Sequence, residues 1–302
     1  MPLIDFLLRR FAHRRPVHEQ PAVHKQDDFH EKSVYEEPLC IYPDCHDAAL
    51  RHLFPSNEHG GIPPSSGDVL VEIADTDPKY KDILHQFDEK WLHSNKPKPK
   101  VHHIYKVSVP ESVTAPYEKY KDDITKKRGI PNERRRCHGT KRACELGEGG
   151  GAGLCTSAQC SLCGILRTGF KLELAGGHKP WKKSPCGRFG RGIYTSATSS
   201  KSDDYSCDEC PSLARHKAML LTKVVVGNGK KLKKDDPSLT SPPEGYDSVI
   251  GEPAGHEEGA LNYDELIVYS NHAVIPAYLI IYGDREPVQV WSEEARHDGK
   301  AA

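Results

Sequence analysis

Hydrophobic and polar positions follow short, regular patterns in a few stretches of this chain. Residues 69–74 (VLVEIA) alternate apolar and polar positions, which is typical of a half-buried strand. After Asp75-Thr-Asp-Pro, apolar side chains recur near helical spacing, and this predicts a helix over 78–94. A segment with two prolines at 95–99 (NKPKP) ends the predicted helix. Residues 102–109 (HHIYKVSV) then predict a second strand, and residues 110–124 predict a second, short helix.

Later strands are predicted from five further runs, in which apolar and β-branched residues are frequent. They are RRCHGT at 135–140, RGIYTS at 191–196, AMLLTKVVVG at 218–227, LIVYS at 266–270 and AYLIIY at 277–282. The connections between them are long and rich in Gly, Pro and Cys. Short, irregularly spaced strands with few helices predict an α+β fold with largely antiparallel sheets and a few flanking helices. The sequence has no glycine-rich dinucleotide turn, P-loop or internal repeat.

Composition limits the size of the folded part. Only 36% of the 302 residues are hydrophobic, the mean hydropathy is −0.65, and Gly and Pro number 25 and 23. We therefore expect one medium-sized globular domain over 67–282, preceded by a disordered region (1–66) and followed by a flexible tail (283–302). No window of 18 apolar residues predicts a membrane-spanning helix, and no secretory signal is predicted, so an intracellular chain with no membrane partner is expected.

Charge gives little information about partners. The net charge is −1, which predicts no polyanion partner for the whole chain. The segment from Lys121 to Arg142 nevertheless holds nine Lys/Arg and three acidic residues. A nuclear localisation signal, a phosphate-binding patch and a solvated loop are all consistent with it. Between nucleus and cytoplasm, the segment favours the nucleus.

Four segments contain residues typical of catalytic sites, although each is common when taken alone. They are Cys137-His138-Gly139-Thr140, Gly190-Arg-Gly-Ile-Tyr194-Thr-Ser, Ser199-Ser-Lys-Ser202-Asp-Asp-Tyr205 and Asn262-Tyr-Asp-Glu265-Leu-Ile-Val-Tyr269. Together and in this order they resemble the catalytic domain of the poly(ADP-ribose) polymerase family. Further similar motifs begin at Asn132 (NER), Leu162 (LCGIL), Met219 and Gly245, so that the resemblance covers roughly residues 69–282.

The resemblance implies an ADP-ribosyltransferase fold and an NAD⁺-dependent ADP-ribosyltransferase, which is a pentosyl-transferring glycosyltransferase. NAD⁺ would be the substrate, a protein would accept the ADP-ribose, the enzyme itself included, and nicotinamide would be released. Poly- and mono-ADP-ribosylation both stay open, as do the acceptor, the activating signal and the oligomeric state. Two alternatives remain: an NAD⁺ glycohydrolase, and a catalytically silent module that binds ADP-ribose or a nucleic acid. The family's nucleic-acid modules are not recognisable in the sequence, so activation by DNA breaks is not expected.

By the same resemblance, His138, Tyr194 and Glu265 form the catalytic His–Tyr–Glu set. Loss of nicotinamide builds positive charge on the ribose, as in glycoside cleavage. Glu265 would hydrogen-bond the 2″-hydroxyl of the nicotinamide ribose and spread that charge. His138 would bind the adenosine-ribose hydroxyls. Lys201 is given no chemical step.

The remaining NAD⁺ contacts are also implied by the resemblance. Tyr194 and Tyr205 would enclose the nicotinamide ring between their aromatic faces. Gly139 would hold the carboxamide through its backbone and let the ligand approach closely. Ser202 would add a hydroxyl bond to the same amide. Thr140 stands where many family members have Ser and could replace its hydroxyl.

The chain differs from the family pattern in its cysteine residues. Cys144, Cys155, Cys160 and Cys163 lie in an insertion after the His138 strand, and the pair Cys207-x2-Cys210 follows Tyr205. A structural zinc needs four ligands, and the spacing does not determine which of these, or Cys137, would complete the set. Packing as free thiols is the other interpretation. The motif Cys40-x4-Cys45-His46 also has two interpretations: it forms half of a metal site, or its two cysteines are unpaired thiols.

Overall fold

The computed structural model describes residues 68–148, 153–175, 187–208, 216–253 and 261–283. All of them belong to one of the two units of the chain, Tyr42–Ala302. The predicted disordered region 1–66 and all of the predicted tail after residue 283 lie outside the described residues. The same holds for Cys40, Cys45 and Cys210 and for the side chain of Cys207.

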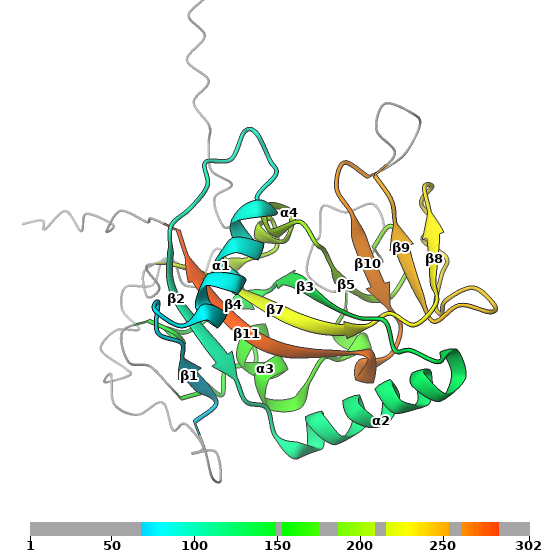
Figure 1. Ribbon diagram of the computed structural model, residues 1–302, viewed down its shortest axis with the longest axis horizontal. Helices are drawn as coiled ribbons and strands as arrows, with labels where there is room; N and C mark the ends of the chain where they lie inside the picture. Colours follow the sequence, from blue (N-terminus) through cyan, green and yellow to red (C-terminus); the bar gives the residue numbers. More distant parts are fainter. Residues whose placement is uncertain (1–67, 149–152, 176–186, 209–215, 254–260, 284–302) are drawn as a thin grey trace, which may run out of the picture. The chain divides into compact units, whose positions relative to one another are not determined.

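A five-stranded antiparallel sheet forms the centre of the described part (Figure 1). Its order is β1 (Leu70–Glu72), β2 (Val101–Val107), β11 (Val274–Tyr282), β7 (Lys217–Val225) and β3 (Glu133–Gly139). The long apolar runs of β7 and β11 follow from their central position, because strands covered on both faces need few polar residues.

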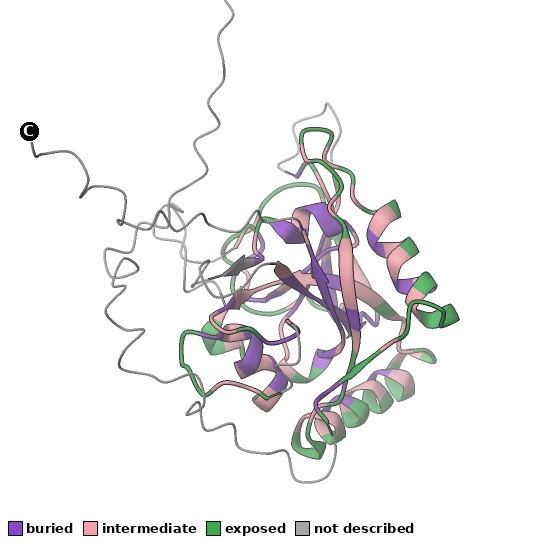
Figure 2. Ribbon diagram, turned by 90° about the vertical axis from the view of Figure 1, so that its left-hand side faces the viewer, coloured by how far each residue is buried: buried purple, intermediate pink, exposed green. Residues whose placement is uncertain are grey.

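Helices cover both faces of this sheet. α1 (Pro78–Glu89) buries Ile83 and Phe87 against Met219 and Ile280 on one face. α3 (Ser161–Thr168) packs its apolar residues against the neighbouring positions Leu220 and Leu279, which point to the other face. α2 (Glu111–Arg128) adds a smaller cluster with Val225 and Ile275. Buried residues accordingly gather in the strands, and exposed ones line the outer turns of the helices (Figure 2).

Both predicted N-terminal helices exist, but their ends differ from the prediction. α1 begins at Pro78, where the Asp77 side chain accepts a hydrogen bond from the Lys79 N–H at 2.7 Å. It ends at Glu89 instead of residue 94, because the N–H groups of Leu92 and His93 bind the Ser200 hydroxyl and do not continue the helix. α2 runs past residue 124 to Arg128.

A second sheet has four strands, in the order β5 (Ile193–Thr195), β10 (Glu265–Val268), β9 (Ser248–Gly251) and β8 (Gly229–Leu232). β5, β10 and β9 pair antiparallel, and β8 pairs parallel with β9. The remaining elements are short: β4 (Lys141–Arg142) and β6 (Cys207–Asp208) pair in parallel, α4 covers Ser199–Asp203, and two 3₁₀ turns, η3 and η4, cover Leu172–Leu174 and Asn271–Ala273. The predicted α+β class with largely antiparallel sheets is confirmed.

The basic segment is not a solvated loop, which corrects one of the three interpretations given above. Its basic residues lie in the last turns of α2, in β3 and in β4, and acidic partners neutralise several of them. Lys127 and Arg128 both pair with Asp247, at 2.8 and 2.7 Å. Arg142 is 1% exposed and donates to the carbonyl oxygen of Leu146 at 2.7 Å. In the part of the chain that the structure describes, no helix has the length and apolar character needed to cross a membrane.

Candidate functional site

The predicted catalytic residues converge where the edges of the two sheets meet. β3 is an edge strand of the five-stranded sheet, and β5 is an edge strand of the four-stranded sheet. Cys137 and Ser196 join them through two backbone hydrogen bonds of 2.8 and 3.0 Å. Residues adjacent to this bridge on each strand, His138 and Tyr194 among them, are therefore held near one another by backbone geometry.

Strand register brings Glu265 to the same place. In the antiparallel pair of β5 and β10, Thr195 lies opposite Leu266 and Tyr194 opposite Ile267. The next position in this register sets Glu265, the first residue of β10, opposite Ser196. The three predicted catalytic residues thus come from three strands that lie side by side.

The His138 ring is oriented by the backbone of β5. Its Nδ1 lies 2.8 Å from the Tyr194 carbonyl oxygen, and its ring lies nearly perpendicular to the Phe170 ring, with 5.0 Å between centroids. Burial lowers the pKa of the His138 imidazole, and the hydrogen bond to the carbonyl offsets this only in part. A neutral imidazole that donates from Nδ1 leaves Nε2 as an acceptor, and an acceptor is what a ribose hydroxyl needs.

Glu265 is buried and only half satisfied. The residue is 7% exposed, and the Lys201 ammonium lies 2.9 Å from its Oε1. Lys201 is itself fixed, since it also donates to the Tyr263 carbonyl oxygen at 2.9 Å. The other carboxylate oxygen, Oε2, is buried and has no hydrogen-bond partner among the described residues. A buried carboxylate oxygen without a donor is costly unless a ligand supplies one.

The two tyrosines have different surroundings. The pKa of the half-buried Tyr205 is raised, first by burial and then by the negative charge of Glu265, so the two side chains interact electrostatically. Tyr194 is held by the turn before β5: its hydroxyl donates to the Gly190 carbonyl at 2.8 Å and accepts from the Phe189 N–H at 2.9 Å. Each tyrosine is thereby tied to the region around β5 and β10.

Gly139 is needed for a reason that sequence reasoning missed. A Cβ atom at this position would lie 1.9 Å from the Ser202 carbonyl oxygen, so α4 can pack on β3 only against a glycine. The Ser202 hydroxyl donates to the Cys137 carbonyl oxygen at 3.1 Å and is buried. Thr140, half-buried, follows directly at the end of β3. The predicted contacts of Gly139, Thr140 and Ser202 with a carboxamide remain predictions.

Two further residues contribute to the site and were not predicted. One is Lys201, described above. The other is Asp264, whose carboxylate accepts hydrogen bonds from the Ser196 hydroxyl, the Ala197 N–H and the Thr198 hydroxyl at 2.8–3.0 Å. Asp264 thus fixes the connection between β5 and α4 to the start of β10. Its position directly before Glu265 was the only signal in the sequence.

Part of this chain is similar to known proteins. The model of the poly(ADP-ribose) polymerase catalytic domain matches residues 155–257, a segment that contains Tyr194, Ser202 and Tyr205 and excludes His138 and Glu265. Protein mono-ADP-ribosyltransferase PARP3 of Homo sapiens is 37% identical over 91 residues, which are 30% of this chain and 17% of the relative. The Gallus gallus protein of the same name is 36% identical over 99 residues, 30% of this chain and 18% of the relative.

The matched segments amount to less than a fifth of the length of these relatives. The likeness is supported by the fold, which has mixed α+β character and antiparallel sheets. It is also supported by the order of elements, in which the matched segment runs from α3 through β5, α4 and β7 to β9. Residues 155–257 are thus similar to the poly(ADP-ribose) polymerase catalytic domain.

Proposed function

We propose that this protein is an NAD⁺-dependent ADP-ribosyltransferase that transfers ADP-ribose to a protein side chain and releases nicotinamide. The similarity of residues 155–257 to this family supports the reaction class, and the relatives' names specify mono-ADP-ribosyl transfer for those proteins. The convergence of His138, Tyr194 and Glu265 from β3, β5 and β10 supports the assignment of the catalytic set.

The observation that carries the proposal is the unpartnered Oε2 of Glu265. Lys201 compensates the charge of the carboxylate at Oε1, so that Oε2 is left for a donor from outside the chain. The 2″-hydroxyl of the nicotinamide ribose is such a donor. A hydrogen bond from this hydroxyl to Oε2 strengthens as positive charge develops on the ribose, and therefore favours the transition state over the ground state.

The reaction balances with these groups. The bond between C1″ of the ribose and the nicotinamide nitrogen breaks, and its electron pair leaves with neutral nicotinamide. The acceptor's nucleophile forms a new bond to C1″ and loses its proton to water or to Glu265. Little chemical activation is needed because nicotinamide is already a good leaving group. The protein therefore contributes mainly orientation, charge stabilisation and exclusion of water.

Each remaining residue has a binding role in this proposal. His138 accepts a hydrogen bond at Nε2 from an adenosine-ribose hydroxyl, and Tyr194 and Tyr205 provide aromatic faces for the nicotinamide ring. Gly139 and Ser202 contact the carboxamide, with Thr140 beside them. The proposed catalytic domain covers residues 67–282. A nuclear location also remains a proposal, supported only by the basic run that ends α2, in which the Lys126 side chain is 79% exposed.

The decisive experiment incubates the full chain with labelled NAD⁺ and follows both protein-bound label and free nicotinamide. Glu265→Gln keeps the shape of the side chain and removes the charge, so transfer should fall at least about 100-fold while NAD⁺ binding changes little. Glu252→Gln is the matched control, because Glu252 also pairs with a lysine, Lys231, but lies after β9 and outside the proposed site. This control should label like the parent protein.

The outcomes separate the candidate functions. Protein label that disappears in Glu265→Gln supports the transferase, and a sharp band or a smear on the gel distinguishes one ADP-ribose from chains. Nicotinamide release without protein label would replace the transferase by an NAD⁺ glycohydrolase. Binding of NAD⁺ without either product would make the chain a silent binding module. Equal labelling by Glu265→Gln and the parent would remove Glu265 from the catalytic set.

A further inference from the structure

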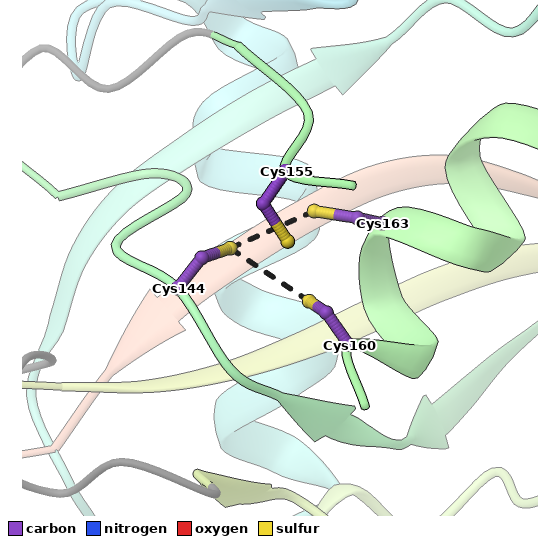
Figure 3. Close-up of side chains that lie close together, drawn as sticks. All are labelled: Cys144, Cys155, Cys160 and Cys163. Carbon is purple, nitrogen blue, oxygen red and sulfur yellow. Dashed lines mark hydrogen bonds between the residues drawn. The ribbon is translucent and has the colours of Figure 1, made fainter. Parts of the chain in front are cut away.

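Four cysteine side chains from three segments meet beside β4 and α3. Cys144 follows β4, Cys155 lies in the connection to α3, Cys160 is the N-cap residue directly before that helix, and Cys163 lies in its first turn (Figure 3). All four sulfur atoms lie within 4.8 Å of one another. Cys144 Sγ lies 3.7 Å from Cys160 Sγ and 3.6 Å from Cys163 Sγ. We propose that these four thiolates bind one structural zinc ion.

The sulfur–sulfur distances fit a metal centre. Four sulfurs at the usual zinc–sulfur distance of about 2.3 Å in a tetrahedron are separated by about 3.8 Å. The distances from Cys144 Sγ to Cys160 Sγ and to Cys163 Sγ are near this value, and the four cysteines are not joined by disulfides. Burial of small apolar side chains explains why Cys160 and Cys163 are 1% and 0% exposed. It does not explain why all four sulfurs, two of them half-buried, point to one place (Figure 3).

The donor set selects both the metal and its role. Four thiolates are soft ligands, which favour zinc over magnesium or calcium. Such a set fills all four positions of a tetrahedral ion and leaves none for water or substrate, so the site is structural and not catalytic. Cys137, the other candidate ligand in the described part of the chain, is not near these four cysteines. It is buried on the α1 face of the sheet, whereas Cys160 and Cys163 are buried on the α3 face.

The surroundings suit a negatively charged zinc–thiolate centre. The Ala143 N–H points to Cys160 Sγ at 3.4 Å, and such donors offset the charge of bound thiolates. Cys160 and Cys163 lie at the N-terminal end of α3, where the helix dipole favours anions. The Arg167 guanidinium, one turn further along the helix, donates to the carbonyl of Cys155 and so ties that ligand segment to α3.

A bound metal ion would stabilise α3, which its own sequence stabilises only weakly. α3 has only eight residues and no side-chain cap at its N-terminus, and helices of this length are unstable alone. Because zinc would bind the folded arrangement of the three segments and not the unfolded chain, its binding free energy would stabilise the fold and hold the helix start in place. Shortly after α3 comes Phe170, whose ring lies nearly perpendicular to the His138 ring at 5.0 Å between centroids. A bound zinc ion would therefore fix α3 and, through Phe170, one side of the predicted NAD⁺ site.

The test measures metal directly on the full chain, purified with a reductant and without a histidine tag or chelator. We expect about one zinc per chain by elemental analysis and an X-ray absorption spectrum with four sulfurs at about 2.3 Å. Cobalt(II) added to the metal-free protein should give the charge-transfer and intense visible bands of a tetrahedral thiolate site. Added zinc should then remove these bands.

Variants assign the ligands. Cys155→Ser replaces a ligand that is half-buried, whereas Cys160 and Cys163 are fully buried. This variant should weaken zinc binding at least about tenfold. The control Cys137→Ala changes a cysteine on the α1 face of the sheet, outside the four-cysteine cluster, and should bind zinc like the parent. The proposal is overturned if the parent holds no zinc and takes up no cobalt, if the spectrum contains nitrogen or oxygen ligands, or if Cys155→Ser retains parental affinity. Because none of these measurements depends on ADP-ribosyl transfer, a failure here is distinguishable from a failure of the proposed function.

Discussion

Among single residues, Glu265 and Lys201 show how a charged group can be buried and still be available to a ligand. A buried carboxylate is costly unless a cation and hydrogen bonds compensate it. Lys201 supplies the cation at Oε1, and the Tyr263 carbonyl fixes the direction of Lys201. Oε2 keeps its capacity to accept. The pair therefore combines charge compensation with an open acceptor in the same side chain.

Substitution of Lys201 tests its role as a positioning residue. Lys201→Met removes the cation that lies 2.9 Å from Glu265 Oε1, so the Glu265 side chain loses its fixed position. We expect kcat to fall about 10- to 100-fold with little change in KM for NAD⁺. Lys201→Arg keeps the charge and should restore much of the activity. A lower kcat that Lys201→Arg does not restore, or a KM that rises as much as kcat falls, would reduce Lys201 to a structural role.

Substitution of Tyr205 tests aromatic stacking on nicotinamide. Tyr205→Ala removes one ring face, and stacking of this kind contributes about 1–3 kcal/mol, so KM for NAD⁺ should rise roughly tenfold or more. Tyr205→Phe keeps the ring and removes only the hydroxyl, and its KM should stay close to the parent value. Steady-state kinetics of nicotinamide release measure both variants. Equal KM values for the alanine variant and the parent would contradict the stacking role.

The sequence predicted the residues that carry a motif and missed those that act through tertiary contacts. His138, Tyr194 and Glu265 stand in recognisable segments, and the structure brings the three strands together. Lys201 and Asp264 stand in the same segments but received no role. Their partners are more than 60 positions away in the chain, and only the pairing of β5 with β10 and the packing of α4 bring them into contact.

Among the elements, the long apolar runs predicted the central strands, whereas the short polar strand β8 was missed. β7 and β11 were predicted because both faces of these central strands are buried. β8 (GKKL) was missed because its polar residues carry no alternating pattern, and only its parallel pairing with β9 makes it a strand. The end of α1 was misplaced for a similar reason, since the hydrogen bonds that end it come from Ser200 in α4.

The position of α4 depends on the buried Asp203, and this predicts a pH dependence. Its carboxylate binds Lys96 at 3.0 Å, Lys217 at 2.9 Å and the Tyr282 hydroxyl at 2.9 Å. Burial raises the pKa of Asp203, but the opposing effects of Lys217 and Lys96 are larger together, so the pKa is lowered. A lowered pKa stabilises the folded state above the unfolded value of about 4, and this stabilisation is lost as the pH falls through the folded value.

Asp203→Asn should therefore destabilise the fold by about 3 kcal/mol at pH 7. The difference from the parent should be constant above about pH 5 and shrink as the pH falls below about 4. Urea unfolding at several pH values measures it. Asp204→Asn is the matched control, because Asp204 also pairs with Lys96 but its side chain is 48% exposed. A difference that did not shrink in acid would mean that the carboxylate charge is not what holds α4.

For the whole molecule, the ends of the described part are tied to the same strand. Near the start, the Ser108 N–H, just after β2, donates to the Val69 carbonyl at 2.8 Å. Near the end, the Gly283 N–H donates to the Lys100 carbonyl at 2.8 Å, just before β2 begins. The two boundaries of the predicted catalytic domain, residues 67 and 282, thus lie next to backbone hydrogen bonds that close the sheet at both ends of β2.

These bonds predict that a fragment of residues 67–283 folds and acts alone. All the hydrogen bonds, ion pairs and core clusters described above lie within this range, so its melting temperature should stay within about 2 °C of the full chain, which corresponds to less than about 1 kcal/mol. Its kcat/KM for nicotinamide release should match as well. A second fragment, 73–283, lacks β1 and should melt lower, because β2 would then become an unprotected edge strand. Equal melting of both fragments would show that β1 contributes nothing to the domain, whereas a large drop already in 67–283 would move its N-terminal boundary into residues 1–66.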